Sequence, residues 1–219
     1  MNHEQWLGTS QYLRDVFGTQ DEQCATMMQR AVAAGLPDIA ISADVGCLLM
    51  LLASTTAPRC IIEVGTLAGY SGIWLAKSLQ PGGRLFTIEK EPAHAAFAQR
   101  EFENAGVSDR VEIRIGAALD VLPGLADELG PQSVDVAFLD AIKPEYFEYW
   151  KILRPLIVPG GLLLADNVLG SGDWWITDAR HPTRMAVDVF NRTIAADESF
   201  TASAVPIREG VLIARRNTR

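Results

Sequence analysis

The fold is decided by the stretch 60-CIIEVGTLAGYSGIWLAKSLQ-80. It begins with a short β-rich run, 60–64, that is apolar except for Glu63, and then passes through Gly65 and Gly69. An apolar segment with helical character follows at 70–80. A strand that turns through glycines directly into a helix is the first half of a βαβ unit. The stretch therefore predicts the start of a parallel sheet covered by helices.

The same alternation continues along the chain. Further β-rich runs and the helical segments between them lie at 84–88, 92–106, 110–115, 117–129, 134–139, 143–155 and 161–165. This spacing predicts an α/β fold with a mostly parallel sheet and helices on both faces. After a helix around 182–196, the runs 200–205 and 210–216 leave no room for a crossover helix. We therefore expect an antiparallel C-terminal hairpin at one end of the sheet.

The N-terminal quarter is helical by its pattern. Helical periodicity runs through 4–34 until a glycine and a proline stop it, and a second apolar helix is expected at 43–55. The chain has no internal repeat and no linker-like segment. One domain is therefore predicted over 1–219, in which the helices of 1–55 form an extension packed on an α/β core of 56–219.

Composition excludes several classes of partner. The 219 residues are 48% hydrophobic and 21% charged, with a net charge of −8. Such an acidic chain lacks the basic face that phosphate contacts need, so we expect no nucleic-acid partner. No segment reaches the ~18 consecutive apolar residues of a membrane span, and the polar N-terminus does not resemble a signal peptide. Cys24, Cys47 and Cys60 lack metal-ligand spacing and are typical of buried thiols in a reducing compartment. We expect a cytoplasmic protein that binds no membrane.

Ligands of open α/β sheets bind beyond the carboxyl ends of the strands. The turn after the first strand, 63-EVGTLAGYSG-72, differs from the GxGxxG fingerprint of dinucleotide sites because its glycines are four residues apart. A single glycine close to the ligand suits a nucleoside without a pyrophosphate. Glu89 ends the second strand, where a carboxylate can hold a ribose diol by a bidentate hydrogen bond. The alternatives are a turn that binds nothing and a solvent-exposed glutamate at a helix start.

Two further strands end in aspartates. Asp140 follows the run 134–139, and Asp166 follows 161–165 with Asn167 next to it. If these strands are neighbours, both carboxylates face one crevice, where they would repel each other and raise one pKa. A divalent cation would relieve that repulsion, and three hard oxygen ligands suit Mg²⁺ rather than zinc. The alternative is that the aspartates only cap a helix and form a turn.

Lys143 stands three residues after Asp140, at the start of a predicted helix. A positive charge is unfavourable there because the helix macrodipole is positive at its N-terminus. Beside a metal, the pKa of the Lys143 ammonium should fall, which fits a general base.

Together, EVGTLAGYS, Glu89, 140-DAIK-143 and 165-ADN-167 resemble the S-adenosylmethionine-dependent, metal-dependent O-methyltransferases. This family includes catechol O-methyltransferase and the plant caffeoyl-CoA O-methyltransferases, and the stretch 35–52 is similar to the lead-in helix of its small bacterial members. The resemblance covers nearly the whole chain from about residue 30. It implies a Rossmann-like class I methyltransferase fold with a seven-stranded sheet, S-adenosylmethionine as cofactor, and a divalent cation, with Mg²⁺ as the expected ion.

The resemblance also implies a set of residues that contact the cofactor. Glu89 would hold the ribose hydroxyls, and Ala118 would lie at the adenine. Ile41 would close over the cofactor. The whole implied set is Ile41, Glu63, Gly65, Tyr70, Ser71, Glu89, Ala118 and Asp140.

At the other end of the site, the resemblance implies that Asp140, Asp166 and Asn167 bind the metal and that Lys143 is the catalytic base. Two departures concern ligand recognition. Ile142 stands where the catechol enzyme has a tryptophan and the plant enzymes an aspartate. No residue matches convincingly the glutamate by which the catechol enzyme holds the second hydroxyl of its substrate.

The expected reaction is methyl transfer to one hydroxyl of a small catechol-like aromatic acceptor, which a metal would chelate and Lys143 would deprotonate. The alternatives are a metal-independent methyltransferase and a non-catalytic nucleoside-binding protein. The loop 170–182 follows the metal ligands, and its Trp174 and Trp175 are candidate acceptor contacts. We expect one indole to face the acceptor and the other to anchor the loop. The apolar N-terminal helices and the resemblance favour a homodimer.

Overall fold

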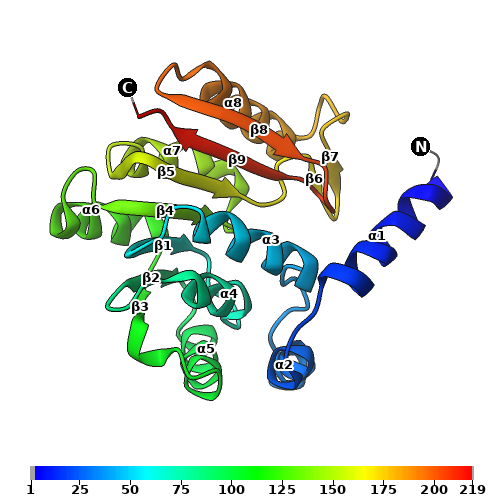
Figure 1. Ribbon diagram of the computed structural model, residues 1–219. Helices are drawn as coiled ribbons and strands as arrows, with labels where there is room; N and C mark the ends of the chain where they lie inside the picture. Colours follow the sequence, from blue (N-terminus) through cyan, green and yellow to red (C-terminus); the bar gives the residue numbers. More distant parts are fainter. Residues whose placement is uncertain (1–2, 219) are drawn as a thin grey trace.

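The computed structural model describes residues 3–218 and centres on one seven-stranded sheet (Figure 1). The strands of this sheet are β1 (Cys60–Val64), β2 (Arg84–Glu89), β3 (Val111–Ile115), β4 (Val134–Leu139), β5 (Ile157–Ala165), β8 (Phe200–Val205) and β9 (Val211–Arg216). They lie in the order β3-β2-β1-β4-β5-β9-β8. The strands from β3 to β5 pair in parallel, and β9 runs antiparallel to both of its neighbours. The predicted mostly parallel sheet with an antiparallel C-terminal hairpin is confirmed.

Helices cover both faces of the sheet. One core layer contains residues of α3 (Ala43–Ser54), α4 (Tyr70–Ser78) and α5 (Pro92–Asn104), and the other contains residues of α6 (Ala118–Leu129), α7 (Tyr146–Leu153) and α8 (Pro182–Ala196). Ile61 and Ile62 are both fully buried but belong to opposite layers, because successive strand residues point to opposite faces. Burial on both faces explains the continuous apolar strands. None of the helices between residues 3 and 218 is long and apolar enough to cross a membrane.

The N-terminal segment corrects one expectation. The helical pattern over 4–34 is two helices, α1 (His3–Phe17) and α2 (Glu22–Ala33), and not one. The second helix begins at Asp21, whose side chain accepts a hydrogen bond from the Cys24 N–H at 2.9 Å. This N-cap is a helix-start signal that periodicity alone does not reveal. α2 contributes to the core beside α4, whereas α1 extends away from the sheet (Figure 1).

Short elements near the carboxyl edge of the sheet also differ from the prediction. The helix expected from residue 143 starts as a 3-10 turn, η2 (Lys143–Glu145), and another 3-10 turn, η1 (Ser108–Arg110), precedes β3. A two-stranded ribbon of β6 (Gly170–Ser171) and β7 (Trp174–Trp175) forms in the loop after β5. Two-residue strands are too short to leave a periodic signal in a sequence.

Strand register brings the ends of three strands together. Val64 pairs with Leu139, and Leu139 pairs with Ala165. The pattern continues one residue further, because the Asp140 N–H donates to the Val64 carbonyl and the Asp166 N–H to the Leu139 carbonyl, each at 2.9 Å. The two aspartates therefore leave the sheet from neighbouring strands, as the sequence predicted.

Candidate active site

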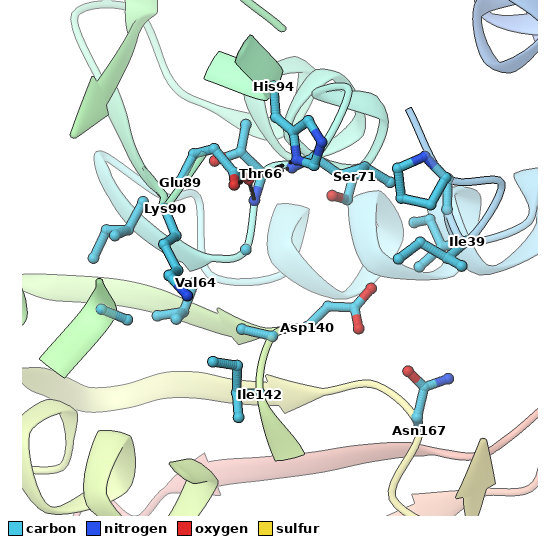
Figure 2. Close-up of a pocket in the computed structure, with 18 of the residues that line it drawn as sticks. Ile39, Val64, Thr66, Ser71, Glu89, Lys90, His94, Asp140, Ile142 and Asn167 are labelled. Atoms are coloured by element: carbon cyan, nitrogen blue, oxygen red, sulfur yellow. Dashed lines mark hydrogen bonds and ion pairs between the residues drawn. The ribbon is translucent and has the colours of Figure 1, made fainter. Parts of the chain in front are cut away.

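A cleft of about 810 Å³ opens at the carboxyl ends of the parallel strands. Its walls come from the turns after β1, β2, β3, β4 and β5, from the loop before α3, and from the turn between β8 and β9. Open α/β sheets bind their ligands in this position, and the volume suits a small molecule. Figure 2 shows Glu89 and His94 at one end, Asp140 near the middle, and Asn167 toward the other end.

The turn after β1 approaches the strand end of β4 closely. Gly65 has a φ of +97°, and a Cβ there would lie 2.1 Å from the Asp140 carbonyl oxygen, so only glycine fits. Gly69 has a φ of +89° directly before α4, where a Cβ would lie 2.9 Å from the Phe102 ring. The sequence predicted both backbone roles, a sharp turn and a helix start.

Glu89, at the end of β2, stabilises this turn by hydrogen bonds to its backbone. Its Oε2 accepts hydrogen bonds from the backbone N–H of Thr66 at 3.2 Å and of Leu67 at 2.7 Å, and its Oε1 accepts one from the Glu91 N–H at 2.9 Å. Oε1 also lies 3.6 Å from His94 Nδ1. A carboxylate has about four lone-pair sites, so about one is left for a ligand. Glu89 thus lines the cleft with part of its hydrogen-bonding capacity free, and its bidentate contact with a ribose stays a prediction.

Glu63 supports the turn from inside the core. It has no exposed surface, and it accepts hydrogen bonds from the Ser71 hydroxyl at 2.5 Å and the Thr87 hydroxyl at 2.6 Å. Burial raises the pKa of Glu63 to about 7, although both hydrogen bonds act in the opposite direction. The cleft wall reaches Ser71 but not Glu63. Glu63 therefore lies behind the cleft wall and holds the Ser71 hydroxyl from inside the core. The contact of Glu63 with the cofactor, which the resemblance implies, stays a prediction.

Two partners hold the ammonium of Lys143. Its Nζ donates to Asp140 Oδ1 and to the Tyr146 oxygen, both at 2.7 Å. The Tyr146 hydroxyl in turn lies 3.0 Å from the Leu139 carbonyl oxygen. Burial alone would lower the pKa of Lys143, but Tyr146 and Asp140 outweigh it and raise that pKa above its usual range. The expected lowering does not come from the protein groups and would have to come from a bound cation.

Asp166 is the more deeply buried carboxylate of the pair. It is 3% exposed, and its Oδ1 has no hydrogen-bond partner among residues 3–218. Burial, and then the charge of Asp140, raise the pKa of Asp166 to about 7. Asn167 follows in a left-handed conformation with φ +56° and lines the cleft. Figure 2 shows the Asn167 amide and the Asp140 carboxylate directed into the same space.

These three residues fit a divalent cation. A buried carboxylate oxygen without a partner is costly, and a cation beside it would satisfy it. Oxygen ligands without histidine or cysteine suit Mg²⁺. In the described part of the chain, no three or more His, Cys, Asp or Glu side chains gather as a metal site. A cation held by Asp140 and Asp166 would therefore depend on Asn167 as its third protein ligand.

The cleft brings most of the predicted site residues together. Those that line it are Ile41, Gly65, Tyr70, Ser71, Glu89, Ala118, Asp140, Lys143 and Asn167. Glu63 and Asp166 lie directly behind the wall, each within one or two residues of a lining residue in the chain.

The structure places both tryptophans away from the cleft. Trp174 is 5% exposed and packs in the core layer of α7 and α8. Trp175 is 44% exposed and covers Gly170, where a Cβ would lie 2.0 Å from the indole. The ribbon contributes Ser171 and Gly172 to the cleft wall instead. Trp174 thus lies in an anchoring position, and neither indole lines the cleft. A contact of either indole with the acceptor stays a prediction.

Several wall residues were not singled out from the sequence. Lys90 and His94 lie near Glu89, and their position follows from the strand end that precedes them. Arg208 and Glu209 come from the turn between β8 and β9. No local pattern reveals that this turn folds back over the cleft. It does so because the Leu169 N–H donates to the Glu209 carbonyl at 2.8 Å.

Comparison with known proteins agrees with this geometry. The sequence model described as O-methyltransferase matches residues 17–217. The chain belongs to the O-methyltransferase family. A relative from Niastella koreensis, named catechol O-methyltransferase, is 37% identical over 203 residues, which cover 93% of this chain and 91% of the relative. A second protein of that name, from Mycobacterium tuberculosis, is 42% identical over 152 residues, or 69% of this chain and 67% of the relative.

Solved structures of O-methyltransferases share the fold of this enzyme. The O-methyltransferase from Bacillus cereus, in complex with SAH, has a TM-score of 0.87 and 33% identity, covering 98% of this chain and 99% of its own. TomG from Streptomyces achromogenes, involved in tomaymycin synthesis and in complex with SAM, has a TM-score of 0.87 and 37% identity, with 99% of each chain covered. These likenesses confirm the predicted class I methyltransferase fold and the predicted transferase class.

Proposed function

We propose that this O-methyltransferase transfers a methyl group from S-adenosylmethionine to one hydroxyl of a small aromatic acceptor with two vicinal hydroxyls. The observation that supports the proposal is that one cleft has two chemically different ends. One end has the turn to which Glu89 is hydrogen-bonded. The other has Lys143 beside Asp140, with an Asp166 oxygen behind them that has no partner among the described residues. The first end suits a nucleoside, and the second suits a chelating diol.

S-adenosylmethionine is the proposed methyl donor because TomG is in complex with SAM and the Bacillus cereus enzyme with SAH. Its sulfonium supplies an electrophilic methyl group. Glu89 would accept a ribose hydroxyl, Ala118 would lie against the adenine, and Tyr70 and Ser71 would line the methionine side under Ile41. The contribution of these residues is orientation and the exclusion of water.

Asp140, Asp166 and Asn167 are the proposed ligands of a divalent cation, with Mg²⁺ as the expected ion. Support comes from the buried Asp166 Oδ1, which has no hydrogen-bond partner between residues 3 and 218, and from the raised pKa of that carboxyl. A bound cation of this kind supplies Lewis-acid chemistry, which lowers the pKa of a coordinated hydroxyl.

Lys143 is the proposed general base. A proton taken from the acceptor would be held at Nζ, where the Asp140 carboxylate and the Tyr146 oxygen stabilise the ammonium at 2.7 Å each. A base must first be neutral, and these same contacts favour the charged form. Use of Lys143 as a base therefore requires that the charge of Asp140 be compensated by another ligand of that carboxylate. Deprotonation would then occur only in a fully assembled site.

Two further proposals concern the molecule as a whole. A homodimer is favoured by apolar side chains that α1 exposes, namely Leu7, Tyr12, Val16 and Phe17. Light scattering at micromolar protein would give the mass of two chains, and the mass of one chain would refute the dimer. A cytoplasmic location is favoured by three cysteines that are all free thiols.

Methyl transfer to a panel of catechols, hydroxycinnamates and their thioesters, with and without Mg²⁺, tests the proposed reaction. We expect methylated vicinal diols, no product from matched monohydroxy compounds, and loss of product in excess EDTA. Turnover that survives in EDTA would favour the second candidate, a metal-independent methyltransferase in which Lys143 is only the counter-ion of Asp140. Binding of the cofactor without methylation of any acceptor would refute the proposed acceptor class.

A further inference from the structure

Arg208 lies in the turn between β8 and β9 and lines the cleft. This turn is fastened to the segment that follows Asn167, because the N–H groups of Val168 and Leu169 donate to the carbonyls of Gly210 and Glu209 at 3.0 and 2.8 Å. Arg208 therefore belongs to the metal end of the cleft and not to the end at which Glu89 would hold the ribose. Its side chain reaches the opposite wall, where Nη1 donates to the Ala40 carbonyl at 3.2 Å.

The backbone of Arg208 has a φ of +47°, a conformation that suits glycine and is unfavourable for other residues. Leu67 and Asn167 also combine a positive φ with a place in the cleft wall. Backbone strain of this kind concentrates at functional sites. Arg208 occupies a strained turn position at which glycine would be more favourable. The presence of a long charged side chain there indicates that the guanidinium has a function.

The guanidinium is not fully engaged by the protein. Within residues 3–218 its contacts are the hydrogen bond to Ala40 and an ion pair of Nε with Glu209 Oε2 at 3.2 Å, which lacks the alignment of a hydrogen bond. A guanidinium carries five N–H donors in a planar fork, so several remain for a ligand. Such a fork matches a carboxylate in a bidentate manner.

Neighbouring acidic groups decide which charge the acceptor should carry. Glu145 accepts a hydrogen bond from the Tyr149 hydroxyl at 2.5 Å, and Asp140 pairs with Lys143. Asp38, also in the cleft wall, is exposed on the loop before α3. At the metal end, Asp140 and Glu145 are thus engaged by other groups, Asp38 is open to water, and the buried Asp166 faces the proposed cation, whereas Arg208 has donors to spare.

We propose that Arg208 binds a carboxylate on the aromatic acceptor, so that the enzyme prefers vicinal diols whose ring carries an anionic substituent. The inference rests on the proposed function and narrows its substrate class. The hydroxyls would lie at Asp140 and Lys143, and the carboxylate would bind where the guanidinium crosses the cleft toward Ala40. Arg208 would contribute to acceptor binding and would take no part in the transfer of the methyl group or proton.

Three probes that differ in one substituent test this assignment: 3,4-dihydroxybenzoate, 3,4-dihydroxybenzamide and 3,4-dihydroxybenzylamine. For each probe, the values for R208Q, R208K and R208G are divided by the value for the parent enzyme. This ratio removes the effect of the substituent on phenol acidity. KM and kcat are measured with S-adenosylmethionine and Mg²⁺. Calorimetry measures binding of the same probes with Mg²⁺ but without the methyl donor. R192Q, which removes an exposed arginine on α8, is the control for loss of one positive charge.

We expect R208Q to raise KM and the dissociation constant for the benzoate about ten- to a hundredfold more than for the amide, with kcat little changed. R208K should recover part of this loss. R208G suits the φ of +47°, so its Tm should not fall, yet it should lose the same preference as R208Q.

If R208Q and R208G weaken the binding of all three probes equally, Arg208 has only a structural role and the proposal is overturned. Stronger binding of the benzylamine than of the benzoate by the parent would overturn it as well, because the acidic residues would then dominate. If no probe is methylated, the proposed function fails, and the calorimetric comparison still decides whether Arg208 binds the carboxylate.

Discussion

The ammonium of Lys143 lies 2.7 Å from the carboxylate of Asp140 and acts as its counter-ion. Asp140 is also one of the proposed metal ligands, so lysine and cation would share one negative charge. At the other carboxylate, Asp166, burial and the charge of Asp140 raise the pKa more than the charges of Lys143 and Arg208 lower it, and Oδ1 has no hydrogen-bond partner in the described part of the chain. The two carboxylates of the proposed metal site therefore differ, because Asp140 has a protein counter-ion in contact and the Asp166 Oδ1 has no hydrogen-bond partner among the described residues.

Replacing Lys143 should separate its two roles. Lys143→Met removes both base and counter-ion, and we expect kcat to fall by about 10²-fold or more while Mg²⁺ binds at least as tightly, because a competitor for Asp140 is gone. Lys143→Arg keeps the charge but cannot accept a proton, so it should be equally slow. Initial rates and calorimetric Mg²⁺ titrations measure both effects. Substantial turnover by Lys143→Arg would show that Lys143 is not the base.

Asp166→Ala should abolish metal-dependent turnover while cofactor binding survives, because Asp166 lies at the opposite end from Glu89. We expect the Mg²⁺ affinity to fall by at least about tenfold and the dissociation constant of S-adenosylhomocysteine to stay within about twofold of the parent value. Calorimetry measures both. Asp127→Ala, which removes an exposed aspartate on α6, is the matched control. A variant at Asp166 with normal turnover would refute the metal assignment.

Much of the sheet was predictable because buried parallel strands appear in the sequence as short, mostly apolar runs. The strands 60–64, 134–139 and 200–205 begin and end where the sequence predicted them, since apolar runs stop at glycine or polar residues. The break between α1 and α2 was missed because one hydrophobic period continues through it, and only Gly18 after α1 and the Asp21 cap before α2 mark it. Local capping overrode the longer pattern there.

The site was predictable where topology alone determines position. Asp140 and Asp166 had to be neighbours once their strands were adjacent, and the structure confirms that adjacency. The pKa direction of Lys143 was not predictable, because it depends on burial and on the contact with Tyr146 that only the 3-10 turn creates. Arg208 was missed for a related reason, since its place in the cleft depends on backbone bonds to a distant segment.

Glu89→Ala should weaken cofactor binding in two ways, by losing a charge-assisted hydrogen bond and by releasing the turn that Glu89 fastens through Thr66 and Leu67. Together these effects correspond to about 2–3 kcal/mol, or roughly 30- to 150-fold in the dissociation constant. Calorimetry with S-adenosylhomocysteine measures the change. Glu91→Ala changes an exposed neighbour whose backbone N–H still reaches Glu89, and it should have little effect. Unchanged affinity in Glu89→Ala would remove Glu89 from the cofactor site.

Glu63 should make stability depend on pH. Its folded pKa of about 7 lies above the ordinary 4.5, so its contribution is fully present below about pH 4.5 and is lost as the pH rises through 7. Glu63→Gln cannot ionise, and between pH 5 and pH 8 its Tm should therefore fall less than that of the parent. Each pKa unit corresponds to about 1.4 kcal/mol, or about 3–6 °C in Tm for a domain of this size. Equal Tm losses in parent and variant, with exposed Glu103→Gln as the control, would contradict a raised pKa.

Substitutions of the two tryptophans in the β6–β7 ribbon should have different effects, one mainly on stability and the other mainly on the choice of acceptor. Trp174 is buried in the core, so Trp174→Ala should cost about 3–5 kcal/mol, lower the Tm by roughly 6–20 °C, and loosen the ribbon that carries Ser171 and Gly172 into the cleft wall. Trp175 is half-exposed over Gly170, so Trp175→Ala should leave the Tm within a few degrees. Because its indole packs over Gly170, next to Ser171 and Gly172 in the cleft wall, we expect this variant to change kcat/KM unevenly across a set of catechols, with cofactor and Mg²⁺ affinities intact. Rates for several acceptors, measured separately for each variant, test this expectation. If both variants keep the parent's ranking of acceptors, the ribbon does not select the acceptor, and that selection must come from the opposite wall of the cleft.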